Sequence, residues 1–405
     1  MSEKNTSRNL RVLVLSGLDR ERFYGQSTRP YYLSRILAQK GCAILHICPN
    51  PPHDPLTSES FLAIRGGYTR TIPSVVKILI RSMTFHADII HAHQIGWTTK
   101  AGRFLAVLLG KPLVVDVHGL DSEERLATGL FNEEETSQME TNERKTLRVA
   151  RKIVVVSDEL GEYLRSRFEV SDDRIVVIPN GVDVRAFKRT RSDSYEYAIR
   201  DSYRIPEGNK LVTFTCPRIE SFPSNEIALK WFFRVIPIMR AVRNDVTYLI
   251  VGGGKEIIPP CKEVIYTGFV GDLQELLSVS DVCVLPYPSN AVCGGVRNKA
   301  LEYFAVGKPV VSTTEGVRGI SDAVPGRDFL LAEDAEMFAK ATLDLLASPS
   351  LARKIGSNGA ALAERYDWSI MGERLIAALL QTDCRNEAET GRAVGRPLEV
   401  GEQSP

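Results

Sequence analysis

Residues 282–314 read VCVLPYPSNAVCGGVRNKALEYFAVGKPVVSTT: a short apolar run, a pair of glycines, an amphipathic stretch and a second apolar run. The apolar runs Val282–Pro286 and Pro309–Thr314 are typical of buried strands, and an apolar side chain at every fourth position predicts a helix over about 296–306. Gly307 is suited to ending that helix. A strand, a helix and a strand in this order predict one parallel βαβ unit.

The same alternation continues on both sides of this unit. Further strands are expected at Leu10–Gly17, Cys42–Cys48, Asp88–His93, Pro112–Gly119, Lys152–Ser157, Arg174–Asn180, Leu211–Cys216, Val246–Val251, Val264–Gly268 and Asp328–Leu331. Further helices are expected at Gln26–Lys40 and at about 225–240, 272–280, 334–347 and 368–381. This order predicts an α/β fold with two Rossmann-like parallel-sheet domains that face each other across a cleft.

A highly charged stretch at 187–209 interrupts the alternation and separates the two domains. We expect an N-terminal Rossmann-like domain over 1–190, a linker over 191–209, a C-terminal Rossmann-like domain over 210–365, a helix returning toward the N-terminal domain over 366–383, and a disordered tail over 384–405.

Composition and charge exclude several classes of protein. The 405 residues are 43% hydrophobic and 25% charged, which is ordinary for a globular protein. Fifty-one Lys and Arg against fifty Asp and Glu give a net charge of +1, so no basic excess points to a nucleic-acid partner. No apolar run approaches the ~20 residues that cross a bilayer. The seven cysteines lack CxxC spacing and predict reduced thiols in a cytoplasmic protein.

The glycine pair and the helix after it form a candidate ligand site. Gly294 and Gly295 leave backbone N–H groups free to meet a phosphate at the positive end of a helix. Asn298 and Glu302 share a helix face, where a carboxylate can bind the ribose diol of the same ligand. The alternative is a solvated glutamate on an amphipathic helix.

These residues resemble the nucleotide-sugar-binding segment of family 4 glycosyltransferases, which have the two-domain GT-B fold. Leu301–Val311 match the family pattern L-E-x-x-A-x-G-K-P-V-V. Other segments match family patterns in the same order along the chain: Asp88–His93 (D-I-I-H-A-H), Ile153–Ser157 and Arg174–Asp183 (V-x-x-S and K-x-x-V-I-P-N-G-V-D), Val264–Val270 (V-x-F-x-G-x-V) and Ser280–Pro286 (A-D-V-x-V-L-P). The resemblance spans about residues 10–382.

The resemblance implies a set of site residues. His118, at a strand end, is expected to face the donor sugar, and Arg218 is expected to neutralise the diphosphate leaving group. The alternatives are a packed histidine and a surface arginine in an ion pair. The donor-binding residues are expected to be Glu302, Gly294, Gly295, Val296, Asn298, Lys299, Val270 and Gly17.

The sequence departs from the family at two positions. The family has two glutamates eight positions apart, but here Gly294 stands at the first position and only Glu302 remains. The family also has a lysine soon after the arginine, whereas no lysine follows Arg218 until Lys230. We hypothesise that backbone N–H groups at the glycines, with Lys299, replace these contacts.

No metal and no other cofactor is expected. His91 and His93 form an H-x-H pair on a strand, a pattern that can ligate zinc. The sequence shows no carboxylate or third histidine at a spacing that completes such a site.

The resemblance implies transfer of a hexose-type sugar, with retention, from a UDP-, GDP- or ADP-sugar to a glycan, a lipid-linked sugar or a small molecule. Two alternatives remain: a nucleotide-sugar epimerase of the same fold, and a non-catalytic binding or scaffold protein. Arg65, Arg70, Lys77 and Arg81 surround an apolar stretch that the resemblance relates to peripheral contact with the inner membrane face; a core-packing helix with a basic edge is the alternative.

Overall fold

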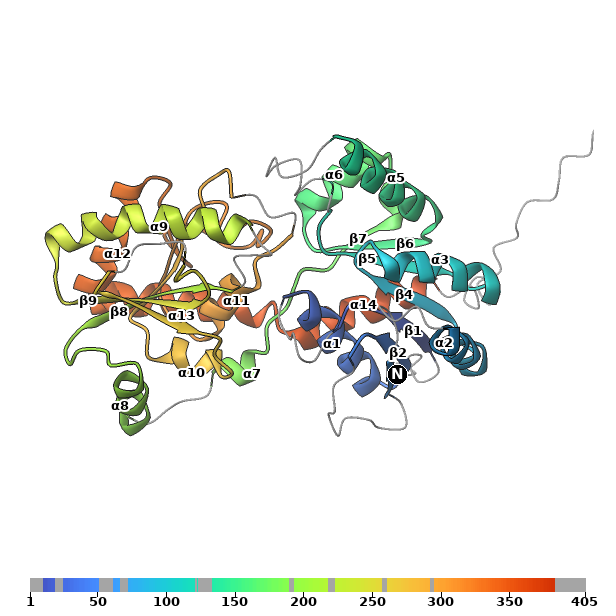
Figure 1. The fold of residues 1–405 in the computed structure, drawn as a ribbon, viewed down its shortest axis with the longest axis horizontal. Helices are drawn as coiled ribbons and strands as arrows, with labels where there is room; N and C mark the ends of the chain where they lie inside the picture. The colour runs from blue at the N-terminus through green and yellow to red at the C-terminus, as the bar shows by residue number, and fades with distance from the viewer. Residues whose placement is uncertain are drawn as a thin grey trace, which may run out of the picture.

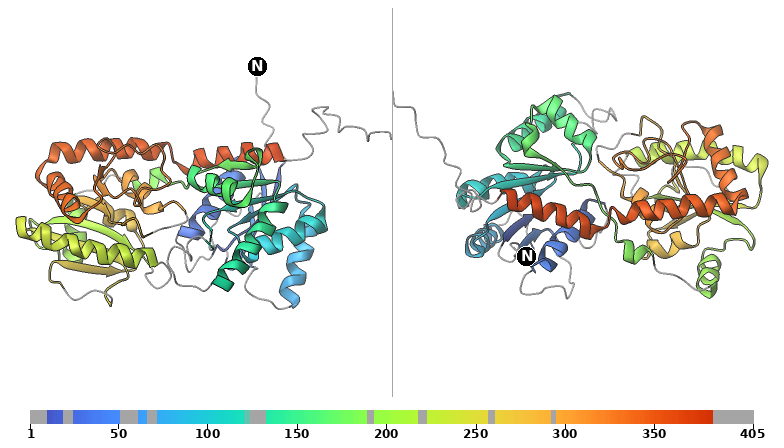
Figure 2. Two further views of the ribbon diagram at one scale, coloured as in Figure 1. Left: turned by 90° about the horizontal axis from the view of Figure 1, so that it is seen from above. Right: turned by 180° about the vertical axis from the view of Figure 1, so that it is seen from behind.

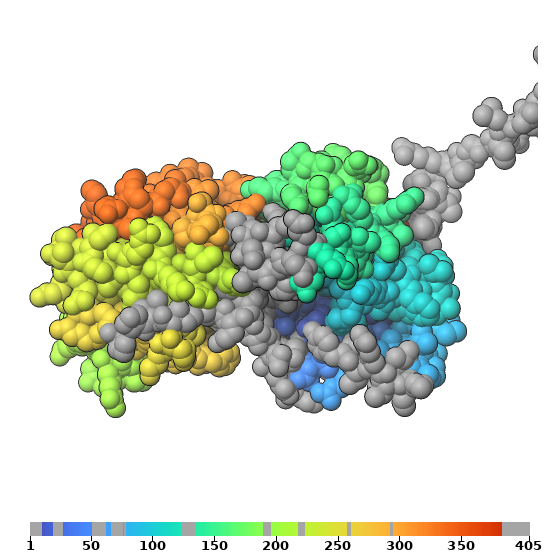
Figure 3. Space-filling model, turned by 45° about the horizontal axis from the view of Figure 1, so that its top comes forward, coloured from blue at the N-terminus to red at the C-terminus, as the bar shows by residue number. Residues whose placement is uncertain are grey.

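The computed structural model describes residues 10–18, 25–50, 61–65, 72–120, 122, 133–188, 193–217, 223–256, 261–291 and 295–382. The described residues form two α/β domains that lie side by side (Figures 1 and 3). The expected fold class, two Rossmann-like parallel-sheet domains, is confirmed. No described helix is long and apolar enough to cross a membrane.

The N-terminal domain holds a parallel sheet of seven described strands in the order β3-β2-β1-β4-β5-β6-β7. Its strands are β1 (Arg11–Leu15), β2 (Ala43–Cys48), β3 (Phe61–Arg65), β4 (Ile89–His93), β5 (Leu113–Val117), β6 (Lys152–Val155) and β7 (Ile175–Val177). Its helices are α1 (Gly25–Gln39), α2 (Ile72–Phe85), α3 (Trp97–Leu109), α5 (Glu133–Val149) and α6 (Asp158–Phe168), with a 3-10 turn at Asp172–Arg174. The short helix α7 (Val184–Phe187) follows and contacts the C-terminal domain. The central strands are buried along their whole length, as expected for a parallel sheet covered on both faces.

The C-terminal domain holds a parallel sheet of six described strands in the order β10-β9-β8-β11-β12-β13. Its strands are β8 (Lys210–Cys216), β9 (Val246–Gly252), β10 (Val264–Gly268), β11 (Val282–Leu285), β12 (Val310–Ser312) and β13 (Leu330–Leu331). Its helices are α8 (Asp193–Ser202), α9 (Pro223–Val242), α10 (Leu273–Ser278), α11 (Asn298–Ala305), α12 (Ala335–Ala347) and α13 (Pro349–Glu364). The unit β11–α11–β12 is the βαβ unit that the opening stretch predicts.

Residues expected as a linker include the helix α8. Ile199, with Tyr203 just beyond the helix, packs against a small apolar cluster of the C-terminal domain. Arg200 lies 3.5 Å from Asp281 and donates to the carbonyl of Val279. Helix α8 therefore belongs to the C-terminal domain, against which it packs its apolar side chains, while charged side chains on its other side face solvent.

The last helix, α14 (Trp368–Thr382), packs on the N-terminal domain beside α1. Figure 2 shows α13 on the C-terminal domain and α14 continuing across the back of the N-terminal one. Trp368 stacks on Tyr32 with ring centroids 5.4 Å apart, and its indole also covers Gly181, where a Cβ atom would lie 2.6 Å from the ring. The chain passes between the domains near Val182 and again near Asp367. These two segments pair side by side in a parallel β-bridge.

Candidate active site

The candidate residues lie beyond the carboxyl ends of the strands, where open parallel sheets bind ligands. Gly17 follows β1 and His118 follows β5 in the N-terminal domain. In the C-terminal domain, the loop at Gly295–Arg297 leads into α11. A Cβ atom built on Gly17 would meet no described residue within 4 Å.

Glu302 lies on the polar face of α11. The opposite face of this helix buries Ala300, Leu301 and Phe304 in the domain core. The Glu302 side chain is half-buried, and its carboxylate makes no hydrogen bond or ion pair with a described residue. Burial raises the pKa of Glu302 to about 7, and nearby Lys299 offsets part of this effect. An unpaired, half-buried carboxylate is suited to accepting hydrogen bonds from a diol.

Lys299 is occupied by groups of its own domain. Its Nζ atom donates to the carbonyl of Thr215 at 2.8 Å, to Oδ1 of Asn225 at 3.1 Å and to the Tyr287 hydroxyl. An ammonium group has three donors, so these partners use them all. A role for Lys299 at the donor phosphates stays a prediction, and it requires at least one of these bonds to break.

Two predicted residues from different domains meet at the backbone. A Cβ atom built on Gly295 would lie 2.1 Å from the carbonyl oxygen of His118, so only glycine fits this contact. One residue further on, the Val296 carbonyl accepts a hydrogen bond from Nδ2 of Asn180 at 3.4 Å. The loop before α11 therefore rests on the strand ends of the N-terminal domain.

His118 is held by polar groups beneath it. Its Nε2 atom lies 3.3 Å from Oδ1 of Asp116 and 3.3 Å from Nδ1 of His93. The side chain keeps 12% of its surface exposed, and its Nδ1 makes no hydrogen bond with a described residue. Burial lowers the pKa of His118 and outweighs the opposing effect of Asp116, so the ring is neutral near pH 7.

The other predicted residues are placed as follows. Asn298 opens α11, and its buried Oδ1 has no partner among the described residues. Val270, after β10, packs against the apolar cluster that also contacts α8. Gly294 and Arg218 lie outside the described residues, so their predicted roles stay predictions.

A buried ion pair beneath His118 was not predicted from the sequence. The Nε atom of Arg29, on α1, lies 2.9 Å and 3.1 Å from the two oxygens of Asp116, and both side chains are almost completely buried. Burial alone would raise the pKa of Asp116, but the Arg29 guanidinium and the neighbouring imidazoles of His118 and His91 hold it well below its usual range. The sequence offers one indication of this pair, namely that Arg29 lies among the first residues of the helix expected over Gln26–Lys40.

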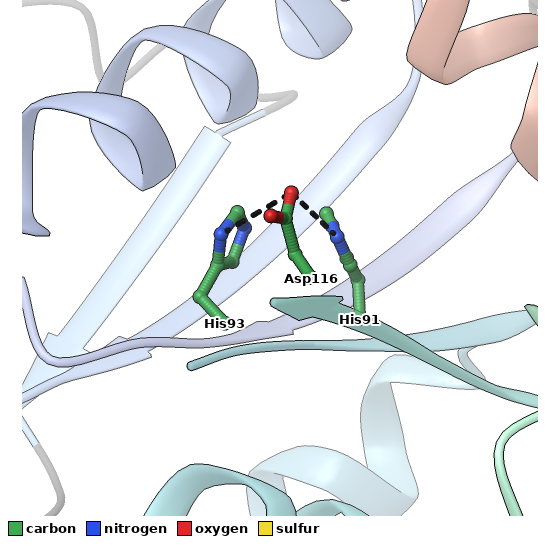
Figure 4. Close-up of side chains that lie close together, drawn as sticks. All are labelled: His91, His93 and Asp116. Carbon is green, nitrogen blue, oxygen red and sulfur yellow. Dashed lines mark ion pairs between the residues drawn. The ribbon is translucent and has the colours of Figure 1, made fainter. Parts of the chain in front are cut away.

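A carboxylate does lie beside His91 and His93, contrary to the expectation from the sequence. Strand β5 lies beside β4, so Asp116 stands between the two histidines, 3.7 Å from Nε2 of His91 and 3.7 Å from Nδ1 of His93 (Figure 4). The three side chains could supply metal ligands. However, the Arg29 guanidinium already neutralises Asp116, which disfavours a second cation there. The absence of a metal stays a prediction.

Comparison with known families decides the identity. A model described as Glycosyltransferase Family 4 matches residues 23–186, and one described as Glycosyl transferases group 1 matches residues 213–348. The chain belongs to glycosyltransferase family 4.

Relatives of this glycosyltransferase support the assignment. The D-inositol 3-phosphate glycosyltransferase of Streptomyces scabiei is 24% identical over 347 residues, 81% of this chain and 74% of that protein. Sucrose-phosphate synthase of Thermosynechococcus elongatus superposes with a TM-score of 0.70 at 18% identity, covering 92% of this chain and 98% of that one. Anabaena HepE, solved with UDP-glucose, gives 0.67 at 18% identity, with 92% and 99% covered. The GT-B fold expected from the sequence is confirmed.

Proposed function

We propose that this glycosyltransferase moves a hexose-type sugar from a UDP-, GDP- or ADP-sugar to a glycan, a lipid-linked sugar or a small molecule. The observation that carries the proposal is the contact between Gly295 and His118, which joins the helix of Glu302 to the strand end of the other domain. Glu302 binds the ribose, backbone N–H groups at Gly294 and Gly295 meet the diphosphate, and His118 faces the sugar. Solved relatives that hold UDP and UDP-glucose support the choice of donor class.

We also propose that the transfer proceeds with retention and without a metal. A retaining mechanism through a covalent enzyme intermediate needs two carboxylates about 5 Å apart. Asp116 is paired with Arg29, and Glu302 is proposed to bind the ribose, so neither of these carboxylates is free to act as the nucleophile. A phosphate oxygen of the leaving nucleotide is suited to take the acceptor's proton as the sugar–phosphate bond breaks, with Arg218 neutralising the diphosphate. The anomeric configuration of the product, read by proton NMR, tests retention, and activity after exhaustive chelation tests metal independence.

Donor affinity is expected to depend on ionised Glu302. Because the pKa of Glu302 is about 7, the wild-type dissociation constant should rise about 7- to 20-fold from pH 8 to pH 5.5. Glu302→Gln should weaken binding about 10- to 100-fold at pH 8 and remove this pH dependence. Titration calorimetry with UDP-, GDP- and ADP-sugars measures both effects.

The exposed Glu336, on α12, supplies a matched control, and Glu336→Gln should bind as the wild type does. If no nucleotide sugar binds the wild type, the proposed function fails and a scaffold role is favoured. Incubation with the donor alone separates the remaining alternative, because an epimerase would convert the donor sugar without an acceptor.

We further propose that the outer surface of α2 and α3 contacts an anionic membrane. The inner side of α2 packs on the core through Ile78 and Leu79, yet Ile80 on its outer side is 55% exposed. On α3, Phe104 and Val107 are 58% and 86% exposed. Neither helix contains an acidic residue, and the exposed Arg81 and Lys100 add positive charge. Both helices lie at the end of the molecule away from the C-terminal domain (Figures 1 and 2).

Ile80→Glu combined with Val107→Glu is expected to reduce binding to vesicles that contain anionic phospholipid by about tenfold. The two carboxylates would oppose insertion of the apolar surface into the bilayer, and they would be repelled by the anionic headgroups. Co-sedimentation measures the bound fraction. Met337→Glu, at an exposed apolar position on α12 of the C-terminal domain, should bind as the wild type. Equal binding by the double variant and the wild type would contradict this surface.

We place the enzyme in the cytoplasm, peripheral to the inner membrane face. Cys216 and Cys283 are buried thiols and Cys261 is a half-buried one, in keeping with a reducing compartment. Fractionation of cells into soluble, membrane-bound and salt-washed pools tests this location.

A further inference from the structure

We propose that Arg29 and Asp116 are a positioning pair that holds His118 as the neutral tautomer protonated at Nε2, and that Arg29 also orients Asn180 toward the loop before α11. The contribution to catalysis rests on the proposed function. The tautomer itself is a property of the protein without ligands.

The tautomer follows from the groups around Nε2 of His118. Asp116 is fully buried and paired with a guanidinium, so it is ionised and can only accept hydrogen bonds. Its Oδ1 atom lies 3.3 Å from Nε2 of His118, so a proton on Nε2 would face an acceptor, whereas a lone pair there would face a negative charge. His93 also faces Nε2, with its Nδ1 3.3 Å away and 3.7 Å from Oδ2 of Asp116. A proton on Nε2 of His118 requires this Nδ1 to be unprotonated, which puts the His93 proton on an Nε2 atom that is buried without a partner among the described residues.

The remaining nitrogen of His118 is then an acceptor. A neutral imidazole carries one proton, so protonation at Nε2 leaves a lone pair on Nδ1. That atom makes no hydrogen bond with a described residue, while the ring keeps some exposed surface. The groups that face the ring from β4, β5 and α1 are His91, His93, Asp116 and Arg29. His118 is thus prepared to accept a hydrogen bond from a hydroxyl group of the bound sugar.

The second part of the proposal concerns the amide of Asn180. Nη1 of Arg29 donates to the carbonyl of Pro179 at 2.8 Å and lies 3.3 Å from Oδ1 of Asn180. Because a guanidinium only donates, Asn180 must present its oxygen to Arg29 and its Nδ2 to the other side. There Nδ2 donates to the carbonyl of Val296, next to the glycine that rests on His118. One buried cation thereby orients two side chains of the N-terminal domain, His118 through Asp116 and Asn180 directly, where this domain meets the loop before α11.

The cluster is better explained by this network than by a metal. Both oxygens of Asp116 already contact Nε of Arg29, and Nη2 of Arg29 is buried without a partner in the described part of the chain. A divalent cation between His91, His93 and Asp116 would face this guanidinium in a site shielded from solvent. Metal analysis of the purified protein therefore belongs to the test.

The first experiment uses the wild type. Nitrogen-15 NMR of labelled imidazoles distinguishes protonated from unprotonated ring nitrogens, and His118→Gln identifies the signals of His118. We expect a protonated Nε2 and an unprotonated Nδ1 at pH 8. A proton on Nδ1 at that pH, or stoichiometric bound metal, would overturn the proposal.

The second experiment separates positioning from binding. Arg29→Lys keeps the charge beside Asp116 but loses the fork that reaches Asn180, so the His118 tautomer should persist while kcat falls about tenfold. Asp116→Asn should lower kcat about 100-fold and change donor affinity less than threefold. Lys40→Gln breaks an exposed ion pair with Glu373 between α1 and α14 and should leave kcat and donor affinity unchanged.

The two hypotheses fail differently. A wild type that binds no nucleotide sugar refutes the proposed function, while the NMR result still decides the tautomer. If Asp116→Asn keeps wild-type kcat, the pair does not position His118 for transfer.

Discussion

Gly295→Ala is expected to reduce kcat/KM at least 100-fold. The new Cβ atom would lie 2.1 Å from the backbone carbonyl oxygen of His118, and neither atom belongs to a side chain that could rotate away. The domains must then separate by about 1 Å, which is the scale of misplacement that costs roughly 100-fold in rate. Steady-state kinetics with a saturating acceptor measures the effect.

Gly161→Ala is the matched control, because Gly161 lies within α6 and its Cβ would meet neighbours only at an ordinary 3.6 Å. That variant should keep its activity and gain a little stability. Thermal unfolding should show that Gly295→Ala still folds, since the collision lies between the domains and not in either core. Wild-type kcat/KM in folded Gly295→Ala would show that transfer does not need this contact.

Acidification from pH 7 to pH 5.5 is expected to destabilise the N-terminal domain by at least 2.5 kcal/mol, about 1.3 kcal/mol for each of two buried histidines. Burial lowers the pKa of His46 to about 3 and that of His93 well below its usual value. The unfolded chain therefore binds protons near pH 6.5 that the native protein does not bind, so stability rises with pH through this window. His118 acts in the same direction, because burial lowers its pKa too.

Urea denaturation at the two pH values measures this loss. Glu302 opposes it, because burial raises its pKa to about 7 and the native protein then binds a proton before the unfolded chain does. The comparison is therefore made in Glu302→Gln. Equal stability at both pH values would contradict burial of neutral histidines.

Most of the fold could be predicted because apolar runs and helical patterns alternate so regularly. The edge strand β3 was not predicted, because its sequence FLAIR is only five residues long and the side chains of Leu62 and Arg65 are exposed to solvent. The helix α8 was not predicted either, because charged residues dominate its composition and only a few apolar side chains touch the domain. Helix α13 follows α12 directly, separated only by Ser348, and was also missed.

Site residues within one continuous motif could be predicted, whereas those assembled from several elements could not. Gly295 and Glu302 lie in one loop and helix, and His118 stands at a strand end. Arg29 and Asp116 are 87 positions apart, and Arg29 and Asn180 are 151 apart, so no local spacing relates them. The order of strands from β1 through β4, β5 and β6 to β7, with α1 packed on the sheet, brings these groups together.

The position of α14 has a consequence for the order of folding during synthesis. Trp368, Met371, Leu375 and Leu379 complete an apolar cluster whose other members include Val12, Val14 and Leu33, near the start of the chain. The N-terminal domain therefore has part of its core open until α14, which follows the C-terminal domain in the chain, has been translated. Because domains otherwise tend to fold as they emerge, this N-terminal domain has to be kept from aggregating while the C-terminal domain is made.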